Sequence, residues 1–179
     1  YHCDEGSTSP TQFTCSKGYF CNNGTQIPCP PGQYSLNTGA KSDADCDACQ
    51  AGKFCVDATQ NFCDPGYICT SSASSKRPID SISGQACPTG SSCPDGKNSD
   101  ACDSGTWQNL EGQSACQQCQ AGYYCPLLND TSSGGIDRLE DVYPCPAGHF
   151  CTAGSFNNFT NAVEKGYFSD LTQQKISIT

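Results

Sequence analysis

Cysteine is the residue type in this sequence whose number and spacing could support chemistry. The 179 residues include 17 cysteines but only 2 histidines. Two pairs, Cys46 with Cys49 and Cys116 with Cys119, have the Cys-x-x-Cys spacing of zinc sites and thioredoxin-like redox sites. A zinc ribbon needs its second pair about 15–20 residues away, whereas these pairs start at positions 46 and 116. A redox site needs a strand–helix setting, which the sequence does not indicate, so structural cross-links are favoured.

Other catalytic and metal-binding patterns are also missing from the sequence. No Ser/His/Asp or Cys/His order indicates a nucleophilic site. Asp43, Asp45 and Asp47 crowd one loop between cysteines, but they lack the ligand spacing of a calcium-binding EF-hand. A solvated acidic loop is the preferred interpretation of these three residues. We therefore expect no enzyme activity, no catalytic or metal-binding residue and no cofactor.

The composition indicates a disulfide scaffold rather than a domain with an apolar core. Leu, Ile, Val and Phe together make up fewer than one residue in seven, and the net charge is −9. A charged chain this poor in apolar residues is expected to be disordered. Its cysteine density reverses that expectation, because disulfides replace the missing core in small secreted domains. We therefore predict an extracellular or cell-surface location.

Charge and hydropathy exclude two classes of partner and predict a modification. The longest basic run is the dipeptide Lys76-Arg77, so no surface for nucleic acid is predicted. No apolar run approaches 18 residues, so no membrane span is predicted within this segment. Three Asn-x-Ser/Thr sequons predict N-linked glycans at Asn23, Asn129 and Asn158.

A seven-residue frame recurs along the chain, with the pattern Cys-x-x-Gly-x-aromatic followed in most copies by Cys. We number the frames 1 to 9, and they begin at Cys15, Cys29, Cys49, Cys63, Cys87, Cys102, Cys119, Cys145 and Val163. Frame 9 (VEKGYFS) has kept the glycine and the aromatic pair but has neither cysteine. The sixth position is aromatic in seven of the nine frames, with Ile68 and Ser92 as the exceptions.

The glycine of the frame predicts a turn. Pro31-Gly32 and Pro65-Gly66 suit the two central positions of a type II turn, whose second residue needs a positive φ. Such a turn folds the chain back, and we expect the flanking cysteines to face partners in neighbouring segments. The aromatic residue is then expected to cover a disulfide or the next module, which would exclude water without a central core.

The elements that must position these cysteines are turns and short irregular strands. A 34-residue offset relates frames 1 and 2 to frames 3 and 4, as in helical tetratricopeptide arrays, but no 3.6-residue apolar periodicity supports helices. Gly, Pro, Ser and Asn dominate instead. The predicted fold class is a small disulfide-rich structure, mostly irregular with short β strands, arranged as an elongated tandem array of cysteine-rich modules with little helix.

The frames divide the chain into five expected parts. These are a partial N-terminal module (1–28), a cysteine-rich module (29–69), a linker with a short cysteine frame (70–101), a second module (102–151), and a cysteine-free tail or start of a further module (152–179). Two insertions, 70–84 and 127–143, separate frames and could carry glycans, contact a neighbour or be simply exposed. Within the second insertion, Leu127 and Leu128 are candidates for a contact surface, although covering a disulfide is an equal alternative.

The motifs CPPGQYS followed by C-x-x-C, and CPAGHFC, resemble the cysteine-rich modules of the growth-factor-receptor type. That group includes tumour-necrosis-factor receptors and ephrin-receptor-like repeats, and similar repeats occur in large extracellular surface proteins of protists. The resemblance implies that a long loop is closed by its own two cysteines and that paired frames cross-link first to third and second to fourth. The implied bridges are Cys29–Cys46, Cys102–Cys116, Cys49–Cys63, Cys55–Cys69, Cys119–Cys145 and Cys125–Cys151.

Five cysteines remain after these pairs. Cys87–Cys93 could close locally and Cys3 could reach Cys21, which leaves Cys15 as the odd cysteine. We expect its partner to lie upstream in a longer array of such modules. A free thiol or an intermolecular disulfide is the alternative.

Two functions fit these features. The preferred one is a structural segment of an extracellular, glycosylated cysteine-rich repeat protein that forms a rod, coat or filament by associating with itself or with other surface proteins. The alternative is the ectodomain of a cell-surface receptor that binds a protein ligand.

Overall fold

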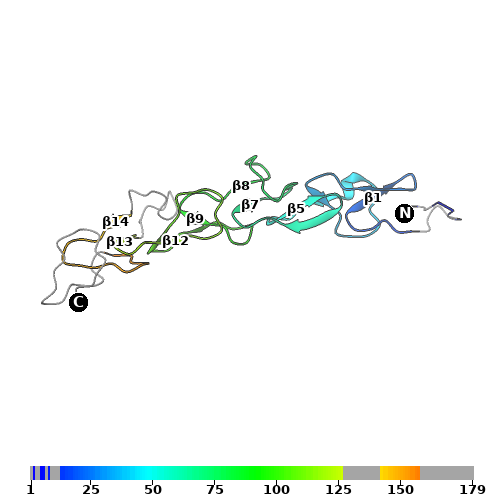
Figure 1. Ribbon diagram of the computed structural model, residues 1–179. Coiled ribbons are helices and arrows are strands. Elements are labelled where there is room, and N and C mark those ends of the chain that lie inside the picture. The colour runs from blue at the N-terminus through cyan, green and yellow to red at the C-terminus, as the bar shows by residue number, and fades with distance from the viewer. Residues whose placement is uncertain (1, 3–4, 7, 9–12, 127–141, 158–179) are drawn as a thin grey trace. The chain divides into compact units, whose positions relative to one another are not determined.

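The computed structural model of the protein describes residues 2, 5, 6, 8, 13–126 and 142–157 (Figure 1). Within these residues the regular structure consists of short strands and one 3₁₀ turn, with no α-helix. The elements are β1 (Tyr19–Asn22), β2 (Thr25–Pro28), β3 (Gln33–Tyr34), η1 (Asp43–Asp45), β4 (Asp47–Ala48), β5 (Lys53–Val56), β6 (Thr59–Phe62), β7 (Tyr67–Cys69), β8 (Gly84–Ala86), β9 (Ser91–Ser92), β10 (Asp100–Ala101), β11 (Thr106–Trp107), β12 (Gln117–Gln118), β13 (Tyr123–Tyr124) and β14 (Tyr143–Pro144).

Each of these strands pairs antiparallel with its neighbour in sequence, so the described residues form separate two-stranded sheets. Positions five and six of every described frame lie in the first strand of a pair or, in frame 8, follow the turn directly. Aromatic residues are frequent at these positions and favour extended backbone. The fold class predicted from the sequence, a disulfide-rich tandem array of short β structure with little helix, is confirmed.

The predicted type II turn is present in the frames. In frame 2 the Gln33 N–H donates to the Pro30 carbonyl at 2.9 Å across Pro31-Gly32, and the equivalent bond closes frames 1, 3, 4, 6, 7 and 8. The glycines of frames 1 to 8 all have φ between 73° and 92°. This left-handed value is the one that the third residue of the turn requires and that glycine adopts without strain.

Eight disulfides join the cysteines in strict order along the chain, and no two disulfide loops overlap. The pairs are Cys15–Cys21, Cys29–Cys46, Cys49–Cys55, Cys63–Cys69, Cys87–Cys93, Cys102–Cys116, Cys119–Cys125 and Cys145–Cys151. The two long-loop bridges and the local Cys87–Cys93 bridge agree with the sequence-based expectation.

The four bridges expected between paired frames are wrong: the structure has no Cys49–Cys63, Cys55–Cys69, Cys119–Cys145 or Cys125–Cys151. The turn itself explains the difference. It reverses the chain inside the frame and brings the first and seventh Cα atoms to between 5.8 and 6.4 Å, which is within the usual range for a disulfide. The two cysteines therefore face each other and not the neighbouring segments.

The same pairing within the frame overturns two further expectations, namely the Cys3–Cys21 bridge and Cys15 as the odd cysteine. Cys21 pairs with Cys15 inside frame 1, so Cys15 needs no partner upstream. Cys3 is the one cysteine not accounted for by these bridges, and it lies outside the described residues.

Cysteines make up most of the buried apolar residues in the described part of the chain. Apart from Ala40 and Ala73, the buried hydrophobic residues among those described are all cysteines. Half-buried aromatic side chains cover some of these cysteines. Phe54 of frame 3 packs on the Cys63 and Cys69 cluster of frame 4, and Trp107 of frame 6 packs on Cys119 and Cys125 of frame 7. The expectation that the aromatic covers a disulfide or the next module is confirmed at both positions.

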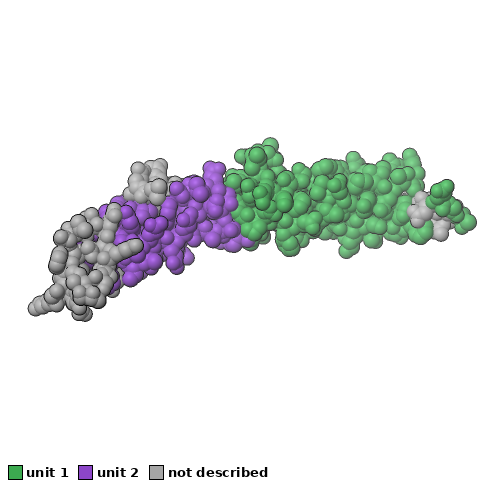
Figure 2. All heavy atoms as spheres, in the orientation of Figure 1, with its two compact units in different colours: residues 1–86, 95–98 green, residues 87–94, 99–179 purple. Residues whose placement is uncertain are grey.

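The residues form two compact units, which are coloured in Figure 2. Unit 1 comprises Tyr1–Ala86 and Asp95–Asn98, and unit 2 comprises Cys87–Pro94 and Ser99–Thr179. The five-part division expected from the frames stays a prediction.

Within each unit, successive frames are joined by a repeated pair of backbone hydrogen bonds. In frame 2 the Gly32 N–H donates to the Cys55 carbonyl at 2.9 Å, and the Gly32 carbonyl accepts from the Cys49 N–H at 2.8 Å. The glycines of frames 1, 3, 5, 6 and 7 make the same two bonds to the seventh and first residues of the following frame. In these six frames the turn glycine is therefore also the point at which one module binds the next.

The glycine has a further role that the sequence did not reveal. A Cβ atom on Gly18, Gly32 or Gly105 would overlap a backbone carbonyl oxygen of the turn that follows the frame two positions ahead, at Ala58, Ser72 and Gly154 respectively. The absence of a side chain therefore permits both the positive φ and the close approach of the other backbone segment.

Two glycines separate these roles in an experiment. Gly105 (φ 83°) would bring its Cβ against the Gly154 carbonyl, whereas Gly148 (φ 82°) has no described atom within 4 Å of a Cβ. We expect Gly148→Ala to lose about 1–2 kcal/mol from the positive φ alone. Gly105→Ala should lose about 1–3 kcal/mol more from the overlap. Denaturant unfolding with the disulfides intact measures both, and equal losses would contradict the close-approach argument.

Peptide mapping without reduction tests the disulfide order. Cleavage before Asp57 cuts the chain between Cys55 and Cys63, which belong to separate bridges. We expect the Cys49–Cys55 and Cys63–Cys69 peptides to separate as independent species. A disulfide-linked peptide that contains both Cys49 and Cys63 would restore the pairing implied by the family resemblance.

Candidate functional site

The first sequon lies on a hairpin turn. Asn23 and Gly24 form the two-residue loop between β1 and β2, with φ of 48° and 79°, as in the type I′ turn that Asn-Gly favours. Asn23 and Thr25 are both exposed, so the acceptor amide is open to modification. Asn129 and Asn158 lie outside the described residues, as do Leu127 and Leu128.

The acidic loop is closed by one of its own carboxylates. Asp45 Oδ2 accepts from the backbone N–H of Lys41 at 2.7 Å and of Ser42 at 3.2 Å, at the start of η1. The hydrogen bond from Lys41 N–H, followed by that from Ser42, lowers the pKa of Asp45. Asp43 and Asp47 lie on the same loop, and the described residues contain no group of three or more His, Cys, Asp or Glu side chains placed to hold a metal ion.

Two further aspartates close turns in the same way. Asp80 accepts from Ser83 Oγ at 2.6 Å and from the N–H groups of Ser83 and Ile82, and these bonds lower its pKa, the Ser83 hydroxyl most of all. Asp95 accepts from the N–H groups of Lys97 and Asn98, and the Asn98 N–H is the main cause of its lowered pKa. These carboxylates fix loops.

The segment between β7 and β8 is anchored to frame 4 by a small ionic cluster. Arg77 Nε lies 2.6 Å from Asp64 Oδ2, and Lys76 Nζ lies 3.5 Å from the same oxygen. The Arg77 hydrogen bond lowers the pKa of Asp64, and the same bond raises that of Arg77. The guanidinium carbon also lies 5.7 Å from the centre of the Tyr67 ring, within cation–π range.

The tip of this segment is apolar and exposed. We call residues 76–82 the isoleucine loop, because Ile79 and Ile82 are 81% and 86% exposed. In Figure 1 this part of the chain loops out between the paired strands β7 and β8. The loop is held by Asp80, by the Ser81 N–H to Gly84 carbonyl bond at 2.9 Å, and by Thr70 Oγ1, which donates to the Ile82 carbonyl at 2.6 Å. Ile79 and Ile82 therefore project from a backbone that several hydrogen bonds hold in place.

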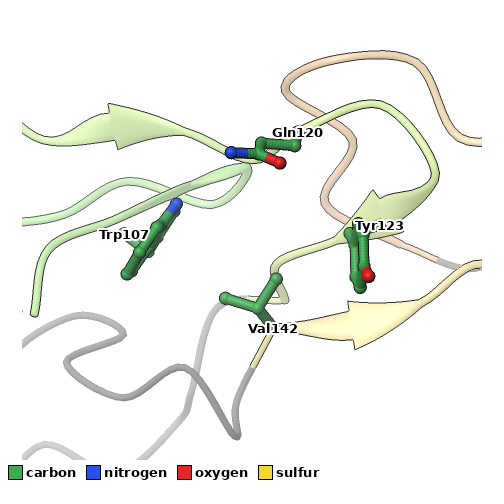
Figure 3. A pocket seen from close by; sticks show the side chains of 4 residues that line it. All are labelled: Trp107, Gln120, Tyr123 and Val142. Atoms are coloured by element: carbon green, nitrogen blue, oxygen red, sulfur yellow. The ribbon is translucent and has the colours of Figure 1, made fainter.

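A hollow of about 310 Å³ lies in unit 2 and is lined by Trp107, Gln120, Tyr123 and Val142. We call it the Trp107 hollow. Trp107 and Tyr123 lie on opposite sides of it, with Val142 between them and Gln120 across from Val142 (Figure 3). Trp107, Tyr123 and Val142 also pack on the Cys119 and Cys125 cluster, so the disulfide of frame 7 supports three walls of the hollow.

Sequence reasoning missed this hollow, although one signal was present. Trp107 is the only tryptophan of the chain and occupies the sixth position of its frame. The pattern predicted that it would cover a disulfide, which it does. Tyr123 of frame 7 and Val142 before β14 complete the hollow around it. Their positions depend on how frames 6, 7 and 8 stack, which the pattern does not reveal.

The hollow has the composition of a binding site for an apolar group. Aromatic walls with a single polar amide at the rim are typical of pockets that hold aliphatic or aromatic side chains. The described residues that line it offer the rings of Trp107 and Tyr123, the aliphatic side chain of Val142 and the amide of Gln120, and these groups suit the binding of an apolar side chain.

The sequence matches no known protein-family model and no curated protein. The described residues form cysteine-rich repeats with short paired strands. Disulfides at this density form in oxidising environments. Over the described part of the chain, no helix has the length and apolar character needed to span a bilayer.

The lowered pKa of Asp80 generates a pH prediction. A carboxylate with a depressed pKa in the folded state stabilises it above the ordinary value of 3.8, and this contribution is lost as the pH falls toward the lower folded pKa. Thermal unfolding with the disulfides intact should therefore show a larger loss of stability below about pH 4 in the unmodified chain than in Asp80→Asn. Ser83→Ala, which removes the strongest donor, should show an intermediate loss. Identical acid profiles for all three proteins would contradict this assignment.

Proposed function

We propose that the chain is a structural segment of an extracellular, glycosylated cysteine-rich repeat protein, which contributes to a coat or filament through contacts with further chains. The observation that carries the proposal is the repeated linkage of the modules. Frames 1, 2, 3, 5, 6 and 7 are each joined to the following frame by the same two glycine hydrogen bonds. Such a structure gains stability from nearest neighbours and can be extended module by module.

The use of the polar residues supports a non-catalytic role. Asp45, Asp80 and Asp95 accept hydrogen bonds from their own loops, and Asp64 holds Arg77. These carboxylates hold the loops in place. In a structure without an apolar core, polar side chains must supply contacts of this kind. An extracellular location is supported by the disulfides and by the exposed sequon at Asn23.

The Trp107 hollow favours a second candidate, a receptor ectodomain that binds a protein ligand. An aromatic hollow of this size could receive one side chain of such a ligand. The structural role remains the preferred function because the linkage between frames recurs within each of the two units, whereas the hollow involves frames 6 to 8 alone.

Self-association of the secreted, oxidised chain tests the proposal. We expect sedimentation velocity to show species whose mass grows with protein concentration, and electron microscopy to show ordered assemblies at the highest concentrations. The reduced and alkylated chain is the control and should lose both. A protein that stays monomeric at every concentration, with all eight described disulfides formed, would contradict the structural role.

A further inference from the structure

We propose that the β1–β2 turn is a site of self-modification, at which the backbone nitrogen of Gly24 attacks the side-chain amide of Asn23 and forms a cyclic imide. The reaction concerns copies of the chain that carry no glycan at Asn23, and it does not depend on the proposed structural function. It requires an accessible amide, a free nucleophilic nitrogen and room for the two to meet.

The turn supplies both the amide and the nitrogen. Asn23-Gly24 is the only Asn-Gly dipeptide of the sequence, and Asn23 is exposed. The strand ladder begins with Asn22 and Thr25, so the Gly24 N–H lies outside it. Within the described part of the chain, neither the Asn23 side chain nor the Gly24 N–H takes part in a hydrogen bond. The electrophile and the nucleophile are therefore adjacent in the chain, and neither is engaged elsewhere.

Glycine gives the attack the room that it needs. The nitrogen must rotate toward the side-chain carbonyl carbon of the preceding residue, and a Cβ on residue 24 would crowd that movement. Gly24 has no Cβ, and glycine backbone rotates more freely than that of any other residue. The loop is also short and exposed, so the rotation displaces no packed neighbour of Asn23.

Frame 3 has the same turn built from less reactive residues. Asp57 and Ala58 join β5 to β6 with φ of 48° and 58°, close to the 48° and 79° of Asn23 and Gly24. Aspartate is ionised at neutral pH, and a negative carboxylate repels a nucleophile. Ala58 also carries a Cβ beside its nitrogen. The hairpin therefore does not require Asn-Gly, and the reactive pair is a feature of the β1–β2 turn.

The single Asp-Gly dipeptide of the described residues is restrained. Asp95 Oδ1 accepts from the backbone N–H groups of Lys97 at 2.8 Å and Asn98 at 2.7 Å. Gly96 is tightly packed, because a Cβ there would lie 2.9 Å from the Cys63 carbonyl oxygen. Both partners of this second dipeptide are thus held in place, unlike Asn23 and Gly24.

The proposed reaction needs only water and a base. A base removes the proton from the Gly24 nitrogen, which bonds to Cγ of Asn23. The Cγ–Nδ2 bond breaks, and Nδ2 leaves as ammonia after gaining a proton. Water then opens the imide at one of its two carbonyl carbons. Opening at Cγ gives aspartate, and opening at the backbone carbon gives isoaspartate. The net change replaces an amino group by a hydroxyl group, with no oxidation or reduction.

The two products differ in how well they fit the hairpin. Aspartate at position 23 reproduces Asp57 of the frame 3 turn, so we expect the hairpin to tolerate it. Isoaspartate carries the chain through its side-chain carbons and lengthens the loop by a methylene group. Asn22 and Thr25 then cannot keep their present register, because turn geometry sets the register of a hairpin.

Two variants test the proposal in the full oxidised chain. Thr25→Val removes the sequon and keeps Asn23-Gly24; it is used because enzymatic removal of an N-linked glycan can itself convert asparagine to aspartate. Thr25 is exposed, and valine suits a strand equally well. The matched control adds Gly24→Ala to Thr25→Val, and Ala58 shows that this turn accepts alanine. The disulfide map checks the folding of both.

The measurement follows residue 23 at mildly alkaline pH by peptide mass, by release of ammonia and by methylation with an isoaspartyl methyltransferase. We expect the Thr25→Val chain to accumulate isoaspartate at position 23, and faster as the pH rises, since the nitrogen must lose its proton. Adding Gly24→Ala should slow the reaction about tenfold, which corresponds to ~1.4 kcal/mol of crowding in the transition state. Glycosylated copies of the unmodified chain should not react, because the glycan occupies the nitrogen that has to leave.

Two results would overturn the proposal. If Asn23 stays intact in the oxidised Thr25→Val chain, the turn is not a reactive site, and reaction in the reduced and alkylated chain would then show that folding protects the amide. If Gly24→Ala leaves the rate unchanged, the nitrogen of residue 24 is not the nucleophile. Neither result bears on self-association, which tests the structural role separately.

Discussion

The turn glycine with positive φ is the constraint on which the rest of this structure depends. It reverses the backbone within seven residues and sets the two cysteines of the frame at bonding distance. The same residue places its N–H and carbonyl where the following frame can bond to both. In six frames, one backbone conformation thus both forms the turn and attaches it to the following frame. Closing a loop of this size stabilises the fold by about 2 kcal/mol in the chain-entropy account, so the bridges replace an apolar core through their number.

This arrangement explains why polar residues take roles that apolar residues fill elsewhere. Asp45, Asp80 and Asp95 each accept hydrogen bonds from backbone N–H groups of their own loop, which no apolar core supports. Asp64 anchors a longer insertion by accepting a hydrogen bond from the side chain of Arg77. The aromatics then shield sulfur, as Phe54 and Trp107 do. Both aromatic side chains remain partly open to solvent, and Trp107 also lines the hollow in unit 2.

Much of this could be predicted from residue types and spacing, and the failures have a common cause. The frame, the positive φ of Gly32 and the covering role of the aromatic position follow from local pattern, whereas the long-loop bridge Cys29–Cys46 was implied by the family resemblance. The pairing of Cys49 was wrong because a resemblance between families was preferred to the geometry of the turn, which already places Cys49 near Cys55. The contact between Gly105 and Gly154 and the position of Val142 beside Trp107 depend on how modules stack. No short stretch of sequence encodes that stacking.

The strict order of the disulfides has a consequence for biosynthesis. From Cys15 onward, each first cysteine of a bridge finds its partner in the next cysteine to emerge. Leaving aside Cys3, which lies outside the described residues, a chain that enters an oxidising compartment from its N-terminus can therefore be oxidised as it arrives, since the earliest available partner of each cysteine is also the native one. Long chains of this design would need little reshuffling by an isomerase, and the number of modules could grow without multiplying the mispaired isomers.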